Sequence, residues 1–573
     1  MQCRFRVLAR NADTRGQLEN RLSTVGQRCL LIVDDYLSAR TERRHRFAMR
    51  ANSPYVLARM KGSEIWVGPE VIPGKTACWR CLQWWLLLRE IDTSCDTGNP
   101  DTYQLVADLL DGAQSLQGRM CSMADRNSRP VWHEILRRPD CPDCGAGMQA
   151  GLVGSLERIR RSVSAITGFV TDIETSESHG SALSFGHIVT PHAPNVPKQR
   201  AAGRMTIAGQ GVDPDSAELA CLAEAAERYS AVFQGHEPRV CATYDEISEF
   251  AIYPAELLQF SEQQYENRYA WNHGEWGFPY VPPRYDPRQQ LEWTAVSSIT
   301  KRTENYLPTQ YCYSASAPAD TPLYCVPDSN GCAAGQTLQD AVARGFLELV
   351  ERDAIAIWWY NRIRRPAVHT DYLDDPEIVS VWGEIKKRRN VEMLDLTTDL
   401  GIFVFGAVAC DAAGSDITLG FGAHFDPKLA ARRAARELAQ VSAECDELPS
   451  GTPQRGSLEY AFARWREQAR ISSEPHLVPI RISSNERRVN YLDPGVSVFK
   501  QCVHTCKQHA LDLLALNLTR PEIGLPVARV VCPELRSPWR RLAPGRLYNL
   551  PVKLGWIPSP RAEHEMNPSP YCL

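Results

Sequence analysis

The sequence lacks any long apolar run, any N-terminal signal-peptide pattern and any strong net charge. Its most apolar short stretch, residues 84–88, is far too short to cross a bilayer, so we expect no membrane span. The first residues contain no apolar segment of signal-peptide length, which predicts a cytoplasmic protein. Lys and Arg number 64 against 68 Asp and Glu. This near balance gives no electrostatic reason to expect a nucleic-acid partner.

Both standard glycine-rich phosphate-binding patterns are also absent. The chain contains no G-x-x-x-x-G-K-[ST], and no G-x-G-x-x-G follows a predicted strand. A nucleotide that binds this protein must therefore be held by another arrangement of groups.

The composition is that of an ordinary globular protein, with 43% hydrophobic and 23% charged residues. At 573 residues the chain is long enough for roughly two to four domains. A glycine-rich stretch between Gly145 and Gly154 predicts a boundary near residue 150, which divides the chain into units 1–150 and 151–573.

Hydrophobic periodicity predicts both strands and helices. Apolar runs typical of strands lie at residues 29–33, 402–410 and 526–532. Helical periodicity lies at residues 216–233, 338–359 and 427–445. Prolines and small polar residues predict long loops at residues 187–203 and 278–287. No internal repeat is visible in the sequence, and we expect an α/β protein of the mixed α+β kind.

Four of the nineteen cysteines form two C-x-x-C pairs, Cys78 with Cys81 and Cys141 with Cys144. Each pair can aim two thiolates at one ion in the tetrahedral arrangement that zinc prefers. We therefore predict a structural zinc site with four protein ligands and no open position for a substrate. Because the two pairs lie farther apart than in common zinc ribbons, a redox dithiol or merely buried thiols are the alternatives.

The motif E-x-x-E-R occurs twice, at residues 224–228 and 348–352. In both predicted helices the glutamates point away from the apolar stripe. Carboxylates three residues apart on facing helices can hold Mg2+ ions that bridge to phosphates, and the adjoining arginine can bind a phosphate oxygen. The alternative, for either motif alone, is a solvated helix face.

The sequences around both motifs resemble the YcaO family. The residues that carry the resemblance are 209–211, 220–229, 329–337, 348–353, 525–533 and a proline-patterned C-terminus. The likeness extends over residues 150 to 573 and implies a YcaO-type ATP-binding domain.

The N-terminal segment resembles the zinc-bearing part of the ThiF-like domain that precedes YcaO in azoline-forming cyclodehydratases. This likeness is carried by residues 67–70, 73–74 and 76–82. In fused members a leader-peptide recognition element stands further upstream. Few residues precede the motif here, so we expect a truncated ThiF-like zinc-binding segment and a separate partner that captures the leader peptide.

The family resemblance implies an ATP-dependent peptide cyclodehydratase. In this family a Cys, Ser or Thr side chain of a ribosomally made peptide attacks the preceding amide carbonyl. ATP phosphorylates the resulting oxygen, and loss of phosphate leaves a thiazoline or oxazoline. Such an enzyme must align nucleophile, carbonyl and γ-phosphate while magnesium ions neutralise the developing charge.

The resemblance also implies the residues that bind ATP and magnesium. The magnesium-binding residues are Glu224, Glu227, Glu348 and Glu351. The further nucleotide-binding residues are Gln336, Asp340 and Arg352, and a further helix contributes Glu437 and Gln440. Two positions depart from the family pattern, because Gln210 stands where many members have lysine and Asp340 is one methylene shorter than the usual glutamate. No residue is assigned as the general base.

The C-terminal tail supplies Pro568, Pro570 and Cys572 as candidate residues of the active site. It approaches the Pro-x-Pro-x-Pro ending of azoline-forming members, with Cys572 in place of the last proline. A proline-rich tail is pre-extended and loses little entropy on ordering, which suits insertion into an active site. An ordinary disordered terminus is the alternative.

The expected partners are a ribosomal precursor peptide, the separate leader-binding ThiF-like protein, a flavin-dependent azoline dehydrogenase and a second copy of the chain. One alternative function is a YcaO-type enzyme that uses an external nucleophile, such as sulfide for thioamide formation. Another is a non-catalytic scaffold, which the departures at Gln210 and Asp340 motivate.

Overall fold

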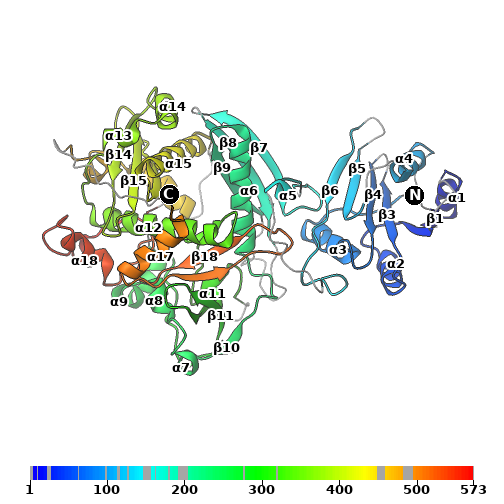
Figure 1. Cartoon of the computed structure of the whole chain (residues 1–573), viewed down its shortest axis with the longest axis horizontal. Coiled ribbons are helices and arrows are strands. Elements are labelled where there is room, and N and C mark those ends of the chain that lie inside the picture. The colour runs from blue at the N-terminus through cyan, green and yellow to red at the C-terminus, as the bar shows by residue number, and fades with distance from the viewer. Residues whose placement is uncertain are drawn as a thin grey trace.

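The computed structural model describes residues 4–9, 11–21, 28–61, 64–96, 100–111, 116–124, 128–145, 156–161, 163–178, 181–190, 204–274, 278–317, 321–447, 458–481 and 495–571 (Figure 1). Helices pack against four sheets, which confirms the predicted mixed α/β architecture. Among the described helices, none combines the length and apolar character needed to span a membrane.

The N-terminal unit contains a six-stranded sheet in the order β1-β2-β3-β4-β5-β6. Its strands are β1 (Arg4–Ala9), β2 (Arg28–Val33), β3 (Tyr55–Lys61), β4 (Glu64–Val71), β5 (Arg119–Met123) and β6 (Val131–Glu134). The first three strands run parallel and the others antiparallel. The helices of this unit are α1 (Ala12–Arg21), α2 (Ala39–Arg50), α3 (Trp79–Leu88) and α4 (Pro100–Asp111).

A three-stranded antiparallel sheet followed by a long helix occurs twice in the rest of the chain. The first consists of β7 (Val170–Ser178), β8 (Ser181–Val189), β9 (Arg204–Gly211) and α6 (Pro214–Ser230). The second consists of β14 (Asn390–Asp395), β15 (Phe403–Cys410), β16 (Thr418–His424) and α15 (Pro427–Glu447). In each, the helix begins with a proline at the same distance from the end of the preceding strand. Proline suits this position, because a backbone N–H in the first turn of a helix would have no partner within the helix.

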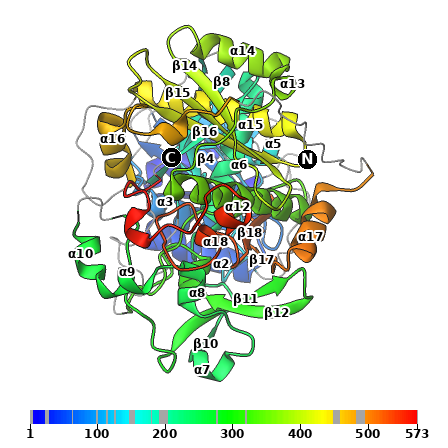
Figure 2. The same ribbon diagram turned by 90° about the vertical axis from the view of Figure 1, so that its left-hand side faces the viewer.

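The largest sheet of the C-terminal part has the order β10-β11-β17-β18-β13, and β12 pairs with β11. Its strands are β10 (Val240–Ala242), β11 (Leu291–Ser298), β12 (Thr303–Pro308), β13 (Cys332–Ala334), β17 (Leu514–Asn517) and β18 (Val527–Val531). The helix α12 (Leu338–Asn361) packs against β18 and is buried along most of its length. The C-terminal segment, red in Figure 2, runs alongside α12.

Shorter helices complete the structure. They are α5 (Leu156–Arg161), α7 (Tyr244–Ile247), α8 (Pro254–Leu258), α9 (Glu262–Glu266), α10 (Arg268–Asn272), α11 (Thr309–Cys312), α13 (Thr370–Leu373), α14 (Pro376–Ile385), α16 (Leu458–Gln468), α17 (Val498–Gln508) and α18 (Arg546–Lys553). Two short 3-10 helices lie at Pro475–Leu477 and Glu563–Glu565.

The predicted strands and helices are confirmed to within a few residues, as β2, β15, β18, α6, α12 and α15. The predicted loop at residues 187–203 was wrong at its start, because residues 187–189 complete β8 and pair with β7 and β9. The rest of that loop beyond residue 190, and the predicted boundary near residue 150, lie outside the described residues. Residues 278–287 contain neither helix nor strand, as predicted.

The N-terminal unit packs against α6 through α3. The ring of Trp85 stacks on that of Tyr229, with centroids 6.4 Å apart and planes inclined by 24°. Trp79 and Trp85 from α3 belong to the same hydrophobic core as Ala225, Ala226 and Tyr229 from α6. One face of α6 is therefore fixed by the N-terminal unit, and the opposite face is left for other contacts.

The contact between α12 and β18 predicts that Gly345→Ala destabilises the protein. A Cβ at Gly345 would lie 2.7 Å from the carbonyl oxygen of Gly331 and from a methyl group of Val530. Overpacking of this kind costs about 1–3 kcal/mol. The matched control is Gly383→Ala, since Gly383 is an exposed residue of α14 with no atom near the new methyl group. Denaturant unfolding should show that the control gains about 0.5–1 kcal/mol, and equal stability of the two variants would contradict the packing.

Candidate active site

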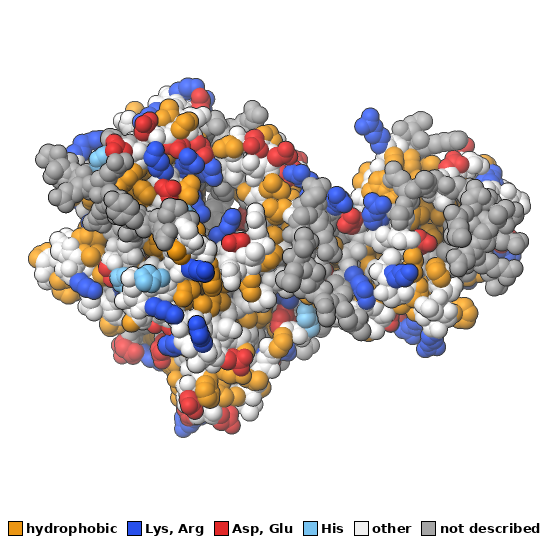
Figure 3. Space-filling model, in the orientation of Figure 1, with side chains coloured by type: hydrophobic (Ala, Val, Ile, Leu, Met, Phe, Trp, Pro, Cys, Tyr) orange, Lys and Arg blue, Asp and Glu red, His pale blue; other side chains and the backbone are white. Residues whose placement is uncertain are grey.

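A cavity of about 590 Å3 opens where α6, α12 and α15 meet β9, β13 and β16. Figure 3 shows a hollow bordered by acidic and basic side chains in this region. Ten charged side chains line the cavity: Glu224, Glu227, Glu348, Glu351, Glu437, Arg228, Arg344, Arg352, Arg433 and Arg436. The five carboxylates and five guanidinium groups balance when all are ionised, so these side chains carry no net formal charge together.

Backbone amides of the neighbouring strands hold three of the carboxylates. Glu224 Oε2 accepts a hydrogen bond from the Ala208 amide at 2.7 Å, and Glu227 Oε1 accepts one from the Ala334 amide at 2.6 Å. Glu437 Oε2 accepts one from the amide of Phe421. Charge-assisted bonds of this kind fix the orientation of a carboxylate and leave its other lone pairs available.

The same pairing of strand amide and helix carboxylate occurs in both copies of the sheet and helix arrangement. The Ala208–Glu224 and Phe421–Glu437 pairs are each 16 residues apart in the chain. Glycines let each helix lie close to its strand, because a Cβ at Gly209 would come within 2.1 Å of the Cys221 nitrogen. A Cβ at Gly422 would similarly come within 2.2 Å of the Ala430 oxygen. The glycines of the motif at residues 209–211 therefore serve helix packing.

Burial raises the pKa of several of the carboxylates that face the cavity. The pKa of Glu227 rises to about 7, chiefly through burial and then through the charge of Glu224. The pKa of Glu348 and that of Glu437 also rise to about 7, with burial as the largest cause. The side chain of Glu348 is 27% exposed, because it faces the cavity. Divalent cations would favour the ionised forms and would be bound more tightly as these groups lose their protons.

The arginines around the cavity make different contacts. Arg228 lies 2.6 Å from Glu224 through Nη2, whereas the Arg433 guanidinium donates to the Ala423 carbonyl at 2.8 Å. Arg436 bonds Glu377 of α14. Arginine is suited to phosphate oxygens because its planar fork donates two parallel hydrogen bonds.

Most of the residues expected from the sequence meet at this cavity. The structure brings together Glu224, Glu227, Glu348, Glu351, Arg352, Glu437, Gln440 and Gln210. Gln336 and Asp340 do not line the cavity, and both are exposed. Asp340 instead completes a capping box with Thr337 at the start of α12. This role explains a short acidic side chain at that position without reference to a nucleotide.

Sequence reasoning missed three arginines of the cavity lining: Arg344, Arg433 and Arg436. Arg344 lies four residues before Glu348, so the two share one face of the helix. Arg433 lies four residues before Glu437, and this i, i+4 spacing places both on one helix face. Because that pattern is common on solvated helices, the sequence alone does not indicate that these arginines line a binding site.

The C-terminal tail reaches the wall of this cavity. Pro570 is buried, Pro568 is exposed, and Cys572 lies outside the described residues. Tyr571 is fully buried, and its hydroxyl oxygen lies 3.1 Å from Arg352 Nη1. Its ring also packs on Phe421, which lines the cavity, with centroids 5.8 Å apart. The described part of the tail is therefore ordered and buried, and Tyr571 is a further residue that the sequence did not indicate.

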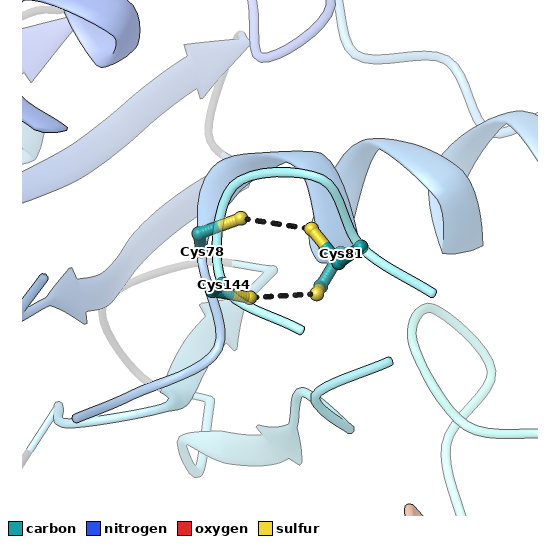
Figure 4. A group of neighbouring side chains, drawn as sticks. Cys78, Cys81 and Cys144 are labelled. Atoms are coloured by element: carbon teal, nitrogen blue, oxygen red, sulfur yellow. Dashed lines mark hydrogen bonds between the residues drawn. The ribbon is translucent and has the colours of Figure 1, made fainter. Parts of the chain in front are cut away.

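The four cysteines of the two C-x-x-C pairs come together outside the lining of this cavity, and Figure 4 labels three of them, Cys78, Cys81 and Cys144. Cys78 Sγ lies 3.5 Å from Cys141 Sγ, and Cys81 Sγ lies 3.4 Å from Cys144 Sγ. A tetrahedral zinc ion with Zn–S bonds of about 2.3 Å requires sulfur atoms about 3.8 Å apart. The four sulfur atoms all lie within 4.8 Å of one another, so the donor set and its size fit a metal ion.

Polar groups around the cysteines stabilise their loops. The Asp143 carboxylate bonds Arg80 Nε at 2.6 Å and His45 Nε2 at 2.8 Å, and His45 Nδ1 bonds Tyr55. The backbone amide of Arg138 points at Cys81 Sγ at 3.4 Å. Hydrogen bonds of this kind orient thiolate ligands.

The raised pKa values predict how the stability of the magnesium-free protein depends on pH. A folded carboxyl with a raised pKa holds a proton that the unfolded chain has already released, so stability falls as the pH rises from about 4.5 to about 7. Glu348→Gln removes this penalty and should raise the free energy of unfolding by about 1–3 kcal/mol at pH 8, with little effect at pH 5.

Denaturant unfolding in magnesium-free buffer between pH 5 and pH 8 measures this difference. The control is Glu256→Gln, an exposed glutamate of α8. A stability difference for Glu348→Gln that does not change with pH, or a destabilisation at pH 8, would contradict the prediction.

Comparison with known proteins identifies the family. The family model described as YcaO cyclodehydratase, ATP- and Mg2+-binding, matches residues 208–536. A solved structure of a heterocyclase in complex with substrate and cofactor is 29% identical, with a TM-score of 0.85 over 100% of this chain and 86% of that chain. The structure of the heterocyclase TruD is also 29% identical, with a TM-score of 0.75 over 99% of this chain and 84% of that chain.

Among curated proteins, an uncharacterised protein of Methanothermobacter thermautotrophicus is 28% identical over 346 residues, which cover 57% of this chain and 81% of that protein. The matched family region contains all three helices that supply the carboxylates of the cavity. The chain therefore belongs to the YcaO family and is an ATP-dependent cyclodehydratase.

Proposed function

We propose that the protein installs thiazoline and oxazoline rings in a ribosomally made peptide by activating the peptide backbone with ATP. The observation that carries this proposal is the likeness of the whole chain, N-terminal segment included, to a heterocyclase at a TM-score of 0.85. The zinc-bearing segment and the proline-patterned tail accompany the azoline branch of the family. They favour ring formation over the thioamide-forming alternative.

In the proposed reaction a thiol or hydroxyl of the peptide adds to the preceding carbonyl carbon. The former carbonyl oxygen takes the γ-phosphoryl group of ATP and releases ADP. Phosphate then departs as the ring C=N bond forms, and the nucleophile and the amide nitrogen each give up one proton. The oxygen and protons of one water are thereby removed from the peptide, and the products are the azoline, ADP and phosphate.

The residues of the cavity fit a nucleotide with its magnesium ions. Glu224, Glu227, Glu348 and Glu351 would hold the magnesium ions, and Glu437 offers a further carboxylate. Cavity arginines, Arg352 among them, would bind phosphate oxygens. These side chains are fixed before a ligand arrives, because strand amides already hold three of the carboxylates. Preorganised charge of this kind stabilises developing charge without reorganisation. Gln336 and Asp340 are assigned to the site by the family resemblance alone.

In this proposal residues 1–150 form a ThiF-like segment held by zinc, and residues 151–573 form the catalytic domain with its tail. Leader-peptide capture falls to a separate ThiF-like partner, and a flavin-dependent dehydrogenase oxidises the azolines. The enzyme works in the cytoplasm as a homodimer. The cavity's carboxylates speak against the scaffold alternative, because a protein that has lost nucleotide chemistry has no need of five half-buried glutamates around one cavity.

Glu351→Gln should abolish ring formation while peptide binding persists, because the substitution removes a carboxylate charge without changing side-chain size. The measurement is mass spectrometry of candidate precursor peptides incubated with ATP, Mg2+, the enzyme and its leader-binding partner. Wild-type enzyme should remove the mass of one water for each ring. The control is Glu384→Gln, a glutamate of α14 outside the cavity lining. Ring formation by Glu351→Gln would overturn the site, and replacement of oxygen by sulfur in the product would favour the thioamide alternative.

The cysteine cluster predicts one bound zinc ion per chain. Cys144→Ser should lose the ion and lower the melting temperature, because α3 begins at this site and its far end packs on α6. Elemental analysis and thermal unfolding measure both effects. Cys241→Ser is the control, since Cys241 is exposed and lies outside the cluster. A metal-free wild-type protein with disulfides at these cysteines would instead support the redox alternative.

A further inference from the structure

The two E-x-x-E-R motifs place their arginines differently. Arg228 lies back on its own helix, with Nε 2.8 Å and Nη2 2.6 Å from the same oxygen of Glu224. The corresponding Arg352 Nε is 3.8 Å from Glu348 and 3.9 Å from Glu351, which is beyond hydrogen-bond distance. Both arginines stand four residues after a glutamate and line the same cavity. Sequence spacing alone therefore does not explain why only Arg228 forms hydrogen bonds with the glutamate four residues before it.

The tail supplies the difference. Arg352 Nη1 donates a hydrogen bond to the Tyr571 hydroxyl oxygen at 3.1 Å, and the guanidinium carbon lies 5.9 Å from the ring centroid. The hydroxyl stays neutral, because burial raises the pKa of Tyr571. A neutral acceptor orients the guanidinium group and leaves its full positive charge available to an anion.

Tyr571 is itself held from several sides. Its backbone amide donates to the Tyr360 hydroxyl at 3.3 Å, and Trp359 Nε1 donates to the carbonyl of Ser569 at 3.0 Å. Its ring packs on Trp359 and Phe421 at centroid distances of 6.1 Å and 5.8 Å. Because Trp359 and Tyr360 lie on α12, the same helix that carries Arg352, the hydroxyl is fixed relative to the guanidinium group.

The position of Arg352 matters for the carboxylates beside it. A guanidinium group bound to a carboxylate occupies the lone pairs and cancels the charge that a divalent cation requires. Arg228 bound to Glu224 shows this closed arrangement in the same molecule, so a Mg2+ ion that binds Glu224 has to displace Arg228. Without its hydrogen bond to Tyr571, Arg352 could bind Glu348 in the same way, since its Nε lies only 3.8 Å from that carboxylate.

We propose that Tyr571 is a positioning residue that holds Arg352 away from Glu348 and Glu351. The two carboxylates then remain open to Mg2+, and the guanidinium group faces the phosphates of ATP. This inference rests on the proposed nucleotide site and assigns to the tail of this chain a role in binding Mg2+ and ATP together.

The test is calorimetric titration of ATP into the full-length protein with and without Mg2+, for wild type and Tyr571→Phe. The substitution keeps the ring and removes only the hydroxyl group. Loss of one hydrogen bond to a charged group should weaken magnesium-dependent ATP binding about tenfold, with little change in the absence of Mg2+. The control is Tyr548→Phe, which removes a 2.9 Å hydroxyl bond to the carbonyl of Leu542 outside the cavity lining. The two variants should have similar melting temperatures.

A double-mutant cycle separates positioning from a general packing effect. In the Arg352→Gln background, Tyr571→Phe should cause no further loss of affinity, because the arginine that it positions is gone. The inference is overturned if Tyr571→Phe binds Mg2+ and ATP as wild type does, or if its effect is undiminished in the Arg352→Gln background. Absence of magnesium-dependent binding by wild type would instead overturn the nucleotide site itself and this inference with it.

Discussion

Five glutamates from three helices face one cavity, and their mutual repulsion has to be balanced before any ligand arrives. The structure balances it in three ways. Strand amides bond individual carboxylates, five arginines supply opposite charge, and burial raises the pKa of Glu227, Glu348 and Glu437 so that protons can replace a missing cation. The protons and the arginine contacts can be exchanged for a bound cation, which then neutralises the carboxylates in their place.

This requirement accounts for features elsewhere in the fold. The strand amides reach the carboxylates only because Gly209 and Gly422 let α6 and α15 lie directly on their strands. The far face of α6 is fixed by Trp85, which lies on the helix that begins at the cysteine cluster. The N-terminal unit thus supports the helix that carries Glu224 and Glu227, although none of its described residues lines the cavity.

The structure brings Glu224, Glu227, Glu348 and Glu351 to one cavity, as the family resemblance implied. The E-x-x-E-R spacing places each pair of glutamates on one helix face, but that spacing alone also suits a solvated helix face. The paired cysteines were also informative, because each C-x-x-C turn can aim two thiolates at one ion, and the four sulfur atoms do come together.

Other parts of the site depend on contacts that no local pattern encodes. Tyr571 meets Arg352 across more than two hundred residues of chain. The two sheet and helix arrangements share Gly209 with Gly422 and Glu224 with Glu437, but too few identical residues to be visible as a repeat. Asp340 lies outside the cavity lining and completes a helix cap, so its place at the nucleotide rests on the family resemblance alone.

The central claim is that the three-helix carboxylate cluster binds metal ions together with a nucleotide. Anomalous scattering from crystals grown with Mn2+ and a non-hydrolysable ATP analogue tests it most directly, because manganese takes magnesium's oxygen ligands and can be located by its own signal. The account predicts manganese peaks between the carboxylates of α6 and α12, bridged by the phosphates of the analogue. Peaks elsewhere, or a bound analogue without metal at these glutamates, would contradict it.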